Sequence, residues 1–252
     1  MKTNISIIIP VLNEESNIIN LITEIKQTLE KKIKYEIVIV DDGSTDNTYN
    51  NLLNYLKSNK EVLVLKHKIN YGQSISLRTG IIHASSDYIV TLDGDGQNDP
   101  KDILKLLKNF NTDKAFMMVI GNRIKRIDNF ARRATSRAAF KIRKIILKDD
   151  TPDTGCAIKI FKKADFLNLP FFNHIHRFLP FLFNSFGGKV ISIQVNHRPR
   201  ISGHSKYSNF QRFLVGINDI LGVIWLSKRS KWPIDCTKVD SIKSVKRGKN
   251  GN

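Results

Sequence analysis

Short apolar runs alternate with amphipathic segments through the first 120 residues of the chain. The apolar runs are rich in β-branched residues and end at polar or turn residues, which predicts strands at Ile5–Ile9, Tyr35–Val40, Val62–Leu65, Tyr88–Leu92 and Phe116–Ile120. The segments between them carry apolar residues three and four positions apart, which predicts helices at Glu15–Glu30, Thr45–Lys57, Gln73–Ala84 and Asp102–Asn109. Such alternation indicates βαβ units, so we predict an α/β fold with a mostly parallel sheet flanked by helices.

Acidic residues follow three of these predicted strands. Glu14 comes after the first strand, Asp41 and Asp42 after the second, and Asp93 and Asp95 after the fourth. Open α/β sheets bind their ligands beyond the carboxyl ends of the strands. Because like charges repel one another and are costly to desolvate, a cluster of this kind needs a cation or a ligand. We therefore predict the functional site at this edge.

The acids after the fourth strand form the pattern Asp93, Asp95 and Gln97, with glycines between them. Oxygen ligands suit a hard cation such as Mg²⁺ or Mn²⁺, which would stabilise the charge on a leaving diphosphate. A plain turn is the competing interpretation. An EF-hand is excluded, because its sixth and twelfth positions would be Asn98 and Leu104.

The acids after the second strand are placed to accept hydrogen bonds from a nucleobase N–H or a ribose hydroxyl. Ser44 and Asp46 are expected to cap the helix that follows. A dinucleotide-binding fold is disfavoured, because the first strand leads into Pro10–Glu14 and not into a GxGxxG loop.

The motifs IIIPVLNEE, VIVDDGSTD and TLDGDGQNDP, in this order and spacing, resemble those of family 2 glycosyltransferases, which have the Rossmann-like GT-A fold. Four later segments resemble the branch that contains dolichol-phosphate mannosyltransferase and bacterial polyprenyl-phosphate glycosyltransferases: Asp153–Cys156, His176–Pro180, Asn196–Arg200 and Ser202–Tyr207. The resemblance covers about residues 4–230. It implies inverting transfer of mannose or another hexose from a GDP- or UDP-linked donor to dolichyl or undecaprenyl phosphate.

The resemblance also implies roles for individual residues. The nucleotide-sugar would contact Pro10, Asn13, Glu14, Asp41, Asp42 and Asp93. The metal, Mg²⁺ or Mn²⁺, would be held by Asp93, Asp95 and Gln97. The catalytic residues would be Asp95, Arg123, Arg200 and Lys206. The acceptor phosphate would meet Arg123, Arg133, Arg177, Arg198 and Ser205.

Such an acceptor needs no catalytic base, because the second pKa of a phosphate monoester lies near 6 and the nucleophile arrives ionised. The enzyme must instead hold two anions together with a metal and with basic side chains. Transfer to a hydroxyl acceptor in cell-envelope glycan synthesis remains an alternative, in which Asp153 would serve as the base. A structural role for Asp153 ahead of Gly155 is favoured here.

Charge divides the chain into two unlike parts. The net charge is +18, yet the first 100 residues carry 10 Lys/Arg against 13 Asp/Glu and the remainder carries 31 against 10. A basic second half indicates a polyanionic partner. A nucleic-acid-binding protein is a remote alternative, because no helix-turn-helix, zinc finger or RNP motif is found, so no nucleic-acid partner is predicted. Two distant cysteines without a CxxC pair indicate a reducing compartment.

No stretch approaches the roughly 20 apolar residues needed to span a bilayer. Phe130–Leu147 has a basic stripe and an apolar stripe, which predicts an amphipathic helix on an anionic membrane surface. Leu214–Leu226 is a second candidate surface helix, whereas the aromatic run Pro170–Phe186 is expected in the core. We predict a peripheral or monotopic protein at the cytoplasmic membrane face, with a membrane-protein partner as one route to anchoring.

The expected organisation is a single GT-A domain over residues 1–226. Residues 1–120 would form its nucleotide-sugar-binding half and residues 121–226 its acceptor- and membrane-facing half. Residues 227–252 carry eight Lys/Arg and little apolar content, which predicts a basic, disordered tail.

Overall fold

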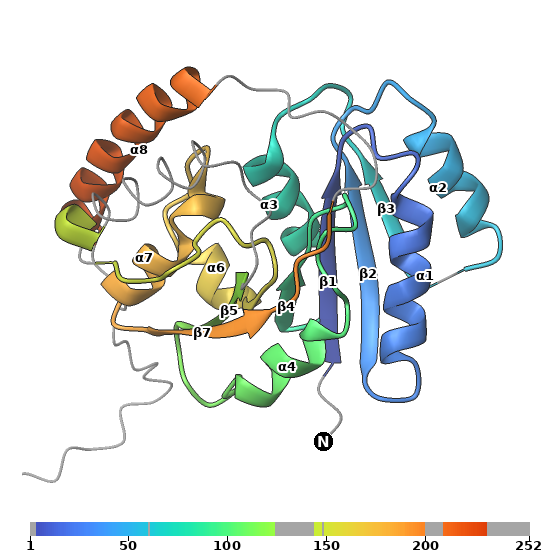
Figure 1. Cartoon of the computed structure of the whole chain (residues 1–252), viewed down its shortest axis with the longest axis horizontal. Coiled ribbons are helices and arrows are strands. Elements are labelled where there is room, and N and C mark those ends of the chain that lie inside the picture. Colours follow the sequence, from blue (N-terminus) through green and yellow to red (C-terminus); the bar gives the residue numbers. More distant parts are fainter. Residues whose placement is uncertain (1–3, 60, 124–143, 148, 200–208, 231–252) are drawn as a thin grey trace, which may run out of the picture.

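The computed structural model describes residues 4–59, 61–123, 144–147, 149–199 and 209–230 (Figure 1). Its strands are β1 (Asn4–Val11), β2 (Lys34–Asp41), β3 (Val62–Lys66), β4 (Tyr88–Thr91), β5 (Met117–Arg123), β6 (Lys159–Lys162) and β7 (Lys189–Val195). Its helices are α1 (Ile18–Leu29), α2 (Thr48–Leu56), α3 (Gln73–His83), α4 (Asp102–Asn109), α6 (Lys163–Leu167), the 3-10 turn η1 (Ile175–Arg177), α7 (Leu179–Ser185) and α8 (Asn209–Arg229). The five strands and four helices predicted in residues 1–120 are confirmed.

In the described residues, the seven strands form one sheet in the order β3-β2-β1-β4-β6-β5-β7. The neighbours from β3 to β4 are parallel, as are β5 and β7. Strand β6 alone lies antiparallel to both of its neighbours, β4 and β5. The prediction of a mostly parallel sheet flanked by helices is confirmed, and the strand inserted from the second half makes the sheet mixed.

Alternate residues of the central strand serve two separate cores. Ile7 and Ile9 of β1 pack in a cluster with α1, α2 and α4, whereas Ile8 packs in a second cluster with α3. This alternation follows from the two-residue period of a strand. Both faces of the sheet are therefore covered by helices (Figure 1).

The second core is aromatic, as the sequence predicts for Pro170–Phe186. Phe161 of β6 and Phe183 of α7 are fully buried, with ring centroids 5.8 Å apart. Helix α8 lies over this core through buried Val223. Its opposite face exposes Leu221 and Trp225, which are 62% and 61% accessible.

The helix starts differ from the prediction because the loops that precede α1 and α2 bind each other. Ser44 was expected to cap α2, but its Oγ accepts a hydrogen bond from the Asn13 backbone N (2.9 Å). The Asn13 side chain in turn accepts from the Thr45 N (2.8 Å). Asp46 does support the first turn of α2, because its carboxylate accepts from the Thr48 N (2.9 Å). These contacts delay both helices by three residues.

Two predictions for the second half need correction or lie outside the described residues. Helix α8 continues to Arg229, with a bond from the Ser230 N to the Leu226 carbonyl (2.8 Å), so a disordered tail does not begin at residue 227. Of the predicted helix Phe130–Leu147, the structure describes 144–147, a helical turn whose Ile145 is 78% accessible. Within the described chain, no helix has the length and apolar character needed to cross a membrane.

Candidate active site

The metal motif follows β4 in a tight turn that needs its glycines. A Cβ on Gly94 would lie 2.6 Å from Val11 Cγ1, so only glycine lets the turn pack against the end of β1. Gly96 has a positive φ of +72°, which glycine adopts without strain. The backbone N of Gln97 then donates to Asp95 Oδ1 (3.1 Å). The turn places Asp93 and Asp95 next to each other.

These two carboxylates form an electrostatic site that favours a cation. Burial and the neighbouring charge of Asp95 raise the pKa of Asp93 from 3.8 to about 6. Glu14 adds to the repulsion, while Lys159 and Arg123 oppose it. One oxygen of Asp93 accepts from Gln73 Nε2 (2.8 Å). A divalent cation bound between the two carboxylates would favour their ionised forms and offset this burial and repulsion.

The donor set fits Mg²⁺ or Mn²⁺. Among the described residues, no group of three His, Cys, Asp or Glu side chains could hold a metal, so the two aspartates would be completed by other oxygens. Mg²⁺ usually takes one or two carboxylates and fills its other positions with water and substrate phosphates. The site therefore suits a metal that arrives with a diphosphate.

Gln97, predicted as the third metal ligand, joins the motif to the segment after β7. Its Nε2 donates to the carbonyl of Arg198 (3.2 Å), and the Arg198 N donates to the Gln97 carbonyl (2.9 Å). Asn98 and His197 form a bridge beside this pair. With the amide nitrogen bound, the side-chain oxygen of Gln97 is the atom left to ligate a metal.

The acids after β2 are held inside the fold. Asp42 is buried, and its carboxylate accepts from the backbone N of Tyr71 (3.0 Å) and of Gly72 (2.7 Å) and contacts His67 Nδ1 (2.7 Å). Asp41 is fully buried, and its Oδ1 accepts from the Ser44 N (3.0 Å). These bonds order the loops at the strand ends that would surround a nucleoside.

The predicted donor residues that follow β1 are built into the same edge. Asn13 has a positive φ of +57°, and its backbone and side chain bind the loop before α2. Glu14 is buried, with its N donating to Thr48 Oγ1 (2.8 Å) and its Oε2 accepting from Asn17 Nδ2 (2.7 Å). Pro10 is half-buried in β1. The structure thus brings Glu14 close enough to Asp93 to influence its charge.

Arg123, predicted to bind the acceptor phosphate, forms a bidentate ion pair. Its Nε lies 2.6 Å from Asp153 Oδ2, and its Nη2 lies 2.8 Å from Asp153 Oδ1. The Asp153 side chain is 4% accessible and that of Arg123 is 17%. Each residue therefore neutralises the other at the end of β5. The ion pair is consistent with the structural role favoured for Asp153, which stays a prediction.

A cavity of about 220 Å³ lies beside Asp93, and its wall contains a cation that the sequence analysis missed. Lys159 is the first residue of β6, and the register pairs it with Thr91 on one side and Ile120 on the other. Since β6 runs antiparallel, its first residue reaches the edge where β4 ends. The only sequence signal was its position three residues after Cys156 in a resembling motif, which did not distinguish it from a surface lysine.

The opposite wall of the cavity comes from η1 and the start of α3. His176 lines the cavity, and its Nδ1 lies 2.7 Å from the hydroxyl oxygen of Ser74. Burial, followed by the charge of Arg177, lowers the pKa of His176 to about 3. Arg177 lines the same cavity, and its predicted contact with the acceptor phosphate stays a prediction. The cavity thus combines a neutral imidazole with two basic side chains.

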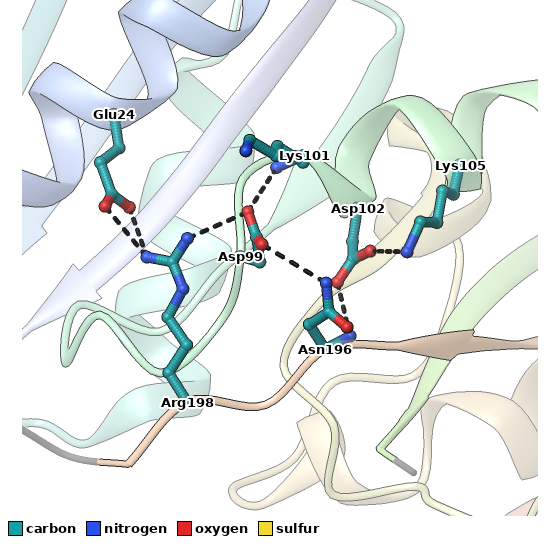
Figure 2. Close-up of polar contacts among 7 residues, drawn as sticks. All are labelled: Glu24, Asp99, Lys101, Asp102, Lys105, Asn196 and Arg198. Carbon is teal, nitrogen blue, oxygen red and sulfur yellow. Dashed lines mark hydrogen bonds and ion pairs between the residues drawn. The ribbon is translucent and has the colours of Figure 1, made fainter. Parts of the chain in front are cut away.

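Arg198, predicted to bind the acceptor phosphate, forms ion pairs with two carboxylates. Figure 2 shows its guanidinium between Glu24 of α1 and Asp99, with Nη1 2.7 Å from Glu24 Oε2 and Nη2 3.2 Å from Asp99 Oδ1. Beside it, the Asn196 N donates to Asp102 Oδ2 (2.7 Å). Arg198 therefore joins the segment after β7 to Glu24 of α1 and to Asp99, which lies just before α4. These two carboxylates already neutralise its charge.

Four other predicted residues, Arg133, Arg200, Ser205 and Lys206, lie outside the described residues. Their assigned roles stay predictions.

The mixed sheet and its strand-end carboxylates define a GT-A-type nucleotide-sugar site, and a comparison of the sequence with known families agrees. The profile described as Glycosyl transferase family 2 matches residues 6–169, more than half of the chain. The chain belongs to this family and is a glycosyltransferase.

Solved structures with the same fold come from glucosyl-3-phosphoglycerate synthase of Mycobacterium tuberculosis. The complex with Mg²⁺ and UDP has a TM-score of 0.67 at 15% identity, covering 89% of this chain and 79% of that one. The complex with Mn²⁺, UDP-glucose and phosphoglyceric acid has a TM-score of 0.66 at 15% identity, covering 91% and 81%. Those synthases bind a divalent metal with UDP, which agrees with the Mg²⁺ or Mn²⁺ predicted here. They do not belong to the polyprenyl-phosphate branch that the sequence resembles, so that branch remains a prediction.

Proposed function

We propose that this glycosyltransferase moves a hexose from a nucleotide-sugar to the phosphate group of a polyprenyl phosphate at a membrane surface. Residues 1–120 would hold the donor, and residues 121–226 would hold the acceptor and face the membrane. The observation that carries the proposal is the cavity beside Asp93, whose walls include the basic side chains of Lys159 and Arg177. A cavity of this charge suits an anionic acceptor.

The donor half of the proposal rests on the aspartate pair. Asp93 and Asp95 would ligate Mg²⁺ or Mn²⁺ together with the diphosphate of the donor, and the oxygen of Gln97 is placed in the same turn. The metal would supply charge stabilisation for the leaving diphosphate. UDP-glucose is the first donor to test, because related structures bind it. GDP-mannose is the second, because the motifs of the polyprenyl-phosphate branch favour it.

The state of Asp153 favours a phosphate acceptor over a hydroxyl acceptor. Hydroxyl transfer would need a base, and both oxygens of Asp153 are bound to Arg123. A phosphate dianion needs no base. One of its oxygens would attack the anomeric carbon while the bond from that carbon to the diphosphate breaks. The electron pair leaves with the nucleoside diphosphate, and no proton is transferred.

A second candidate acceptor is a small phosphorylated acid. The related synthase structures were solved with phosphoglyceric acid, which also carries a phosphate group. The same basic cavity would suit such a ligand. The two acceptors differ in whether a membrane is required.

An anionic membrane surface is supported by the outer face of α8 and the neighbouring helical turn. Leu221, Trp225, Ile145 and Ile146 are exposed apolar side chains, and Lys144, Lys228 and Arg229 are exposed basic ones. Apolar side chains beside basic ones are typical of elements that lie at a lipid interface. The proposal places this face on the cytoplasmic leaflet, with a membrane-protein partner as an additional anchor.

The experiment incubates the full chain with Mn²⁺ and radiolabelled UDP-glucose or GDP-mannose. Undecaprenyl phosphate in anionic vesicles is offered in one arm and 3-phosphoglycerate in the other. The expected product is a labelled glycolipid that Asp95→Asn abolishes and that the exposed-loop control Asp113→Asn leaves unchanged. Label found only in glucosylated phosphoglycerate would replace the lipid acceptor by the second candidate.

A further inference from the structure

Lys159 carries a buried charge without a carboxylate partner. The residue is 4% accessible, and its Nζ donates to the backbone carbonyl of Cys156. Among the described residues, no ion pair includes Lys159. A buried ammonium is costly unless an opposite charge or several acceptors compensate it. One neutral carbonyl leaves two of its three N–H groups for other partners.

The surrounding charges do not remove this excess. Asp153 also attracts Lys159, but its bidentate pair with Arg123 occupies both of its oxygens. Asp93 attracts Lys159 but belongs to the carboxylate pair proposed to bind the metal. When a divalent cation neutralises Asp93, Lys159 loses part of its electrostatic compensation. An anion that arrives with or after the metal would restore it.

The cavity gives that anion a place. Its wall contains the basic side chains of Lys159 and Arg177, together with Gln73, Thr154 and His176 as neutral polar groups. His176 is a neutral imidazole in contact with Ser74, so it does not compete for the anion as a third cation. Asp93 lies at the boundary of the cavity. An anion bound here would therefore be adjacent to the metal and to the leaving group.

We infer that Lys159 and Arg177 bind the phosphate group of the acceptor, with Lys159 as the inner ligand. This inference rests on the proposed function and replaces Arg123 and Arg198 in the predicted acceptor set, because both of those guanidiniums are held by carboxylates. It names a residue on β6, a strand that the sequence analysis did not predict. It also explains why a lysine occupies this buried position. An oxygen of a bound phosphate needs a hydrogen-bond donor there, and packing of the cavity wall does not.

The test measures phosphate binding without the transfer reaction. The full chain is saturated with Mg²⁺ and UDP and titrated with inorganic phosphate by calorimetry. Wild type should bind phosphate, and Lys159→Met should weaken that binding at least tenfold while changing the affinity for Mg²⁺ and UDP less than twofold. Lys162→Met, on the same strand and half-buried, is the matched control and should bind like wild type.

Two results would overturn the assignment. Equal phosphate binding by wild type and Lys159→Met would remove Lys159 from the acceptor site. A loss of UDP affinity with unchanged phosphate affinity would assign Lys159 to the donor. If Lys159→Met does not fold, acetylation of Lys159 in the wild-type chain is followed by mass spectrometry with Mg²⁺ and UDP present. Phosphate should then slow acetylation, and an unchanged rate counts against the inference.

The phosphate-binding test and the glycolipid assay can fail separately. A chain that binds phosphate through Lys159 but makes no glycolipid would retain the anion site and refute the polyprenyl acceptor. A chain that makes glycolipid with unchanged kinetics in Lys159→Met would retain the proposed function and refute the role of Lys159.

Discussion

Arg123 at the end of β5 and Asp153 in the loop before β6 meet through two parallel hydrogen bonds of 2.6 and 2.8 Å. Planar guanidinium and carboxylate groups match each other in this geometry, and little of either side chain reaches solvent. The pair therefore holds the two strands together where the candidate acceptor cavity begins.

Substituting one member of this pair should destabilise the protein more than replacing both members by apolar residues. Asp153→Asn leaves a buried, unpaired guanidinium and should lower the free energy of unfolding by about 3 kcal/mol. The double variant Arg123→Met/Asp153→Leu should recover at least half of that loss. Denaturant unfolding of the single and double variants measures both values.

Turnover by the folded fraction of Asp153→Asn separates the two candidate acceptor chemistries. A structural Asp153 predicts residual transfer in proportion to the folded protein. Complete loss of turnover with normal stability and normal donor binding would show that Asp153 is a base for a hydroxyl acceptor.

The charge of Asp93 should oppose folding at neutral pH. Its pKa is raised from 3.8 to about 6 by burial and by Asp95, so the folded state holds more protons than the unfolded state between these values. The contribution of Asp93 to the free energy of unfolding therefore falls as the pH rises from about 4 to about 6. Asp93→Asn should stabilise the metal-free protein at pH 7 more than at pH 4, as measured by chemical unfolding.

The same titration should affect metal binding. Because Mn²⁺ must displace the proton from Asp93, the affinity for Mn²⁺ in the presence of UDP should weaken as the pH falls below about 6. Calorimetry in buffers of different ionisation enthalpy would detect the released proton. A constant affinity from pH 5 to pH 7 would exclude Asp93 as a ligand.

Arg198 and Glu24 should behave as a structural pair in kinetic measurements. Their side chains are 37% and 43% accessible, so the pair should contribute at most about 1 kcal/mol to stability. Arg198→Gln and Glu24→Gln should give similar, small decreases in the melting temperature. Neither should raise the KM for the acceptor. A tenfold higher KM in Arg198→Gln alone would restore Arg198 as a phosphate ligand.

The outer face of α8 should bind anionic membranes. Leu221 and Trp225 are four residues apart on one helix, so they lie on the same face. Burial of each is worth about 2 kcal/mol, and Leu221→Glu/Trp225→Glu should weaken sedimentation with phosphatidylglycerol vesicles at least tenfold. Leu53→Glu, at an exposed leucine of α2, adds one negative charge on the opposite side of the molecule (Figure 1) and should have no effect. Equal binding by all variants would refute the proposed membrane face.

The sequence predicted the donor side of the fold well because its signals are local. Each strand from β1 to β5 is a short apolar run, and Asp93 and Asp95 directly follow one of them. Position after a strand is enough to place such residues at the ligand-binding edge. The loop before α2 was less predictable, since Ser44 serves a residue 31 positions away and not its own helix.

The roles of the basic residues could not be read from spacing. Arg198 is neutralised by Glu24, 174 positions earlier, and nothing in the local sequence distinguishes it from a phosphate ligand. Lys159 begins the short strand β6, which reads Lys-Ile-Phe-Lys, and its sequence position does not distinguish it from a solvent-exposed lysine. Its burial depends on the insertion of β6 between β4 and β5, which is a property of the assembled sheet.

The position of β6 also sets an order of events during synthesis. Strands β1 to β4 are complete once residue 91 has been made, and they can pair in parallel with β4 as an open edge. That edge stays uncovered until residues 159–162 emerge from the ribosome, because β5 reaches β4 only through β6. The nascent chain thus presents its acidic half as a separate folding unit before the basic half arrives. Slow translation between residues 91 and 162 would prolong the exposure of the β4 edge to other chains.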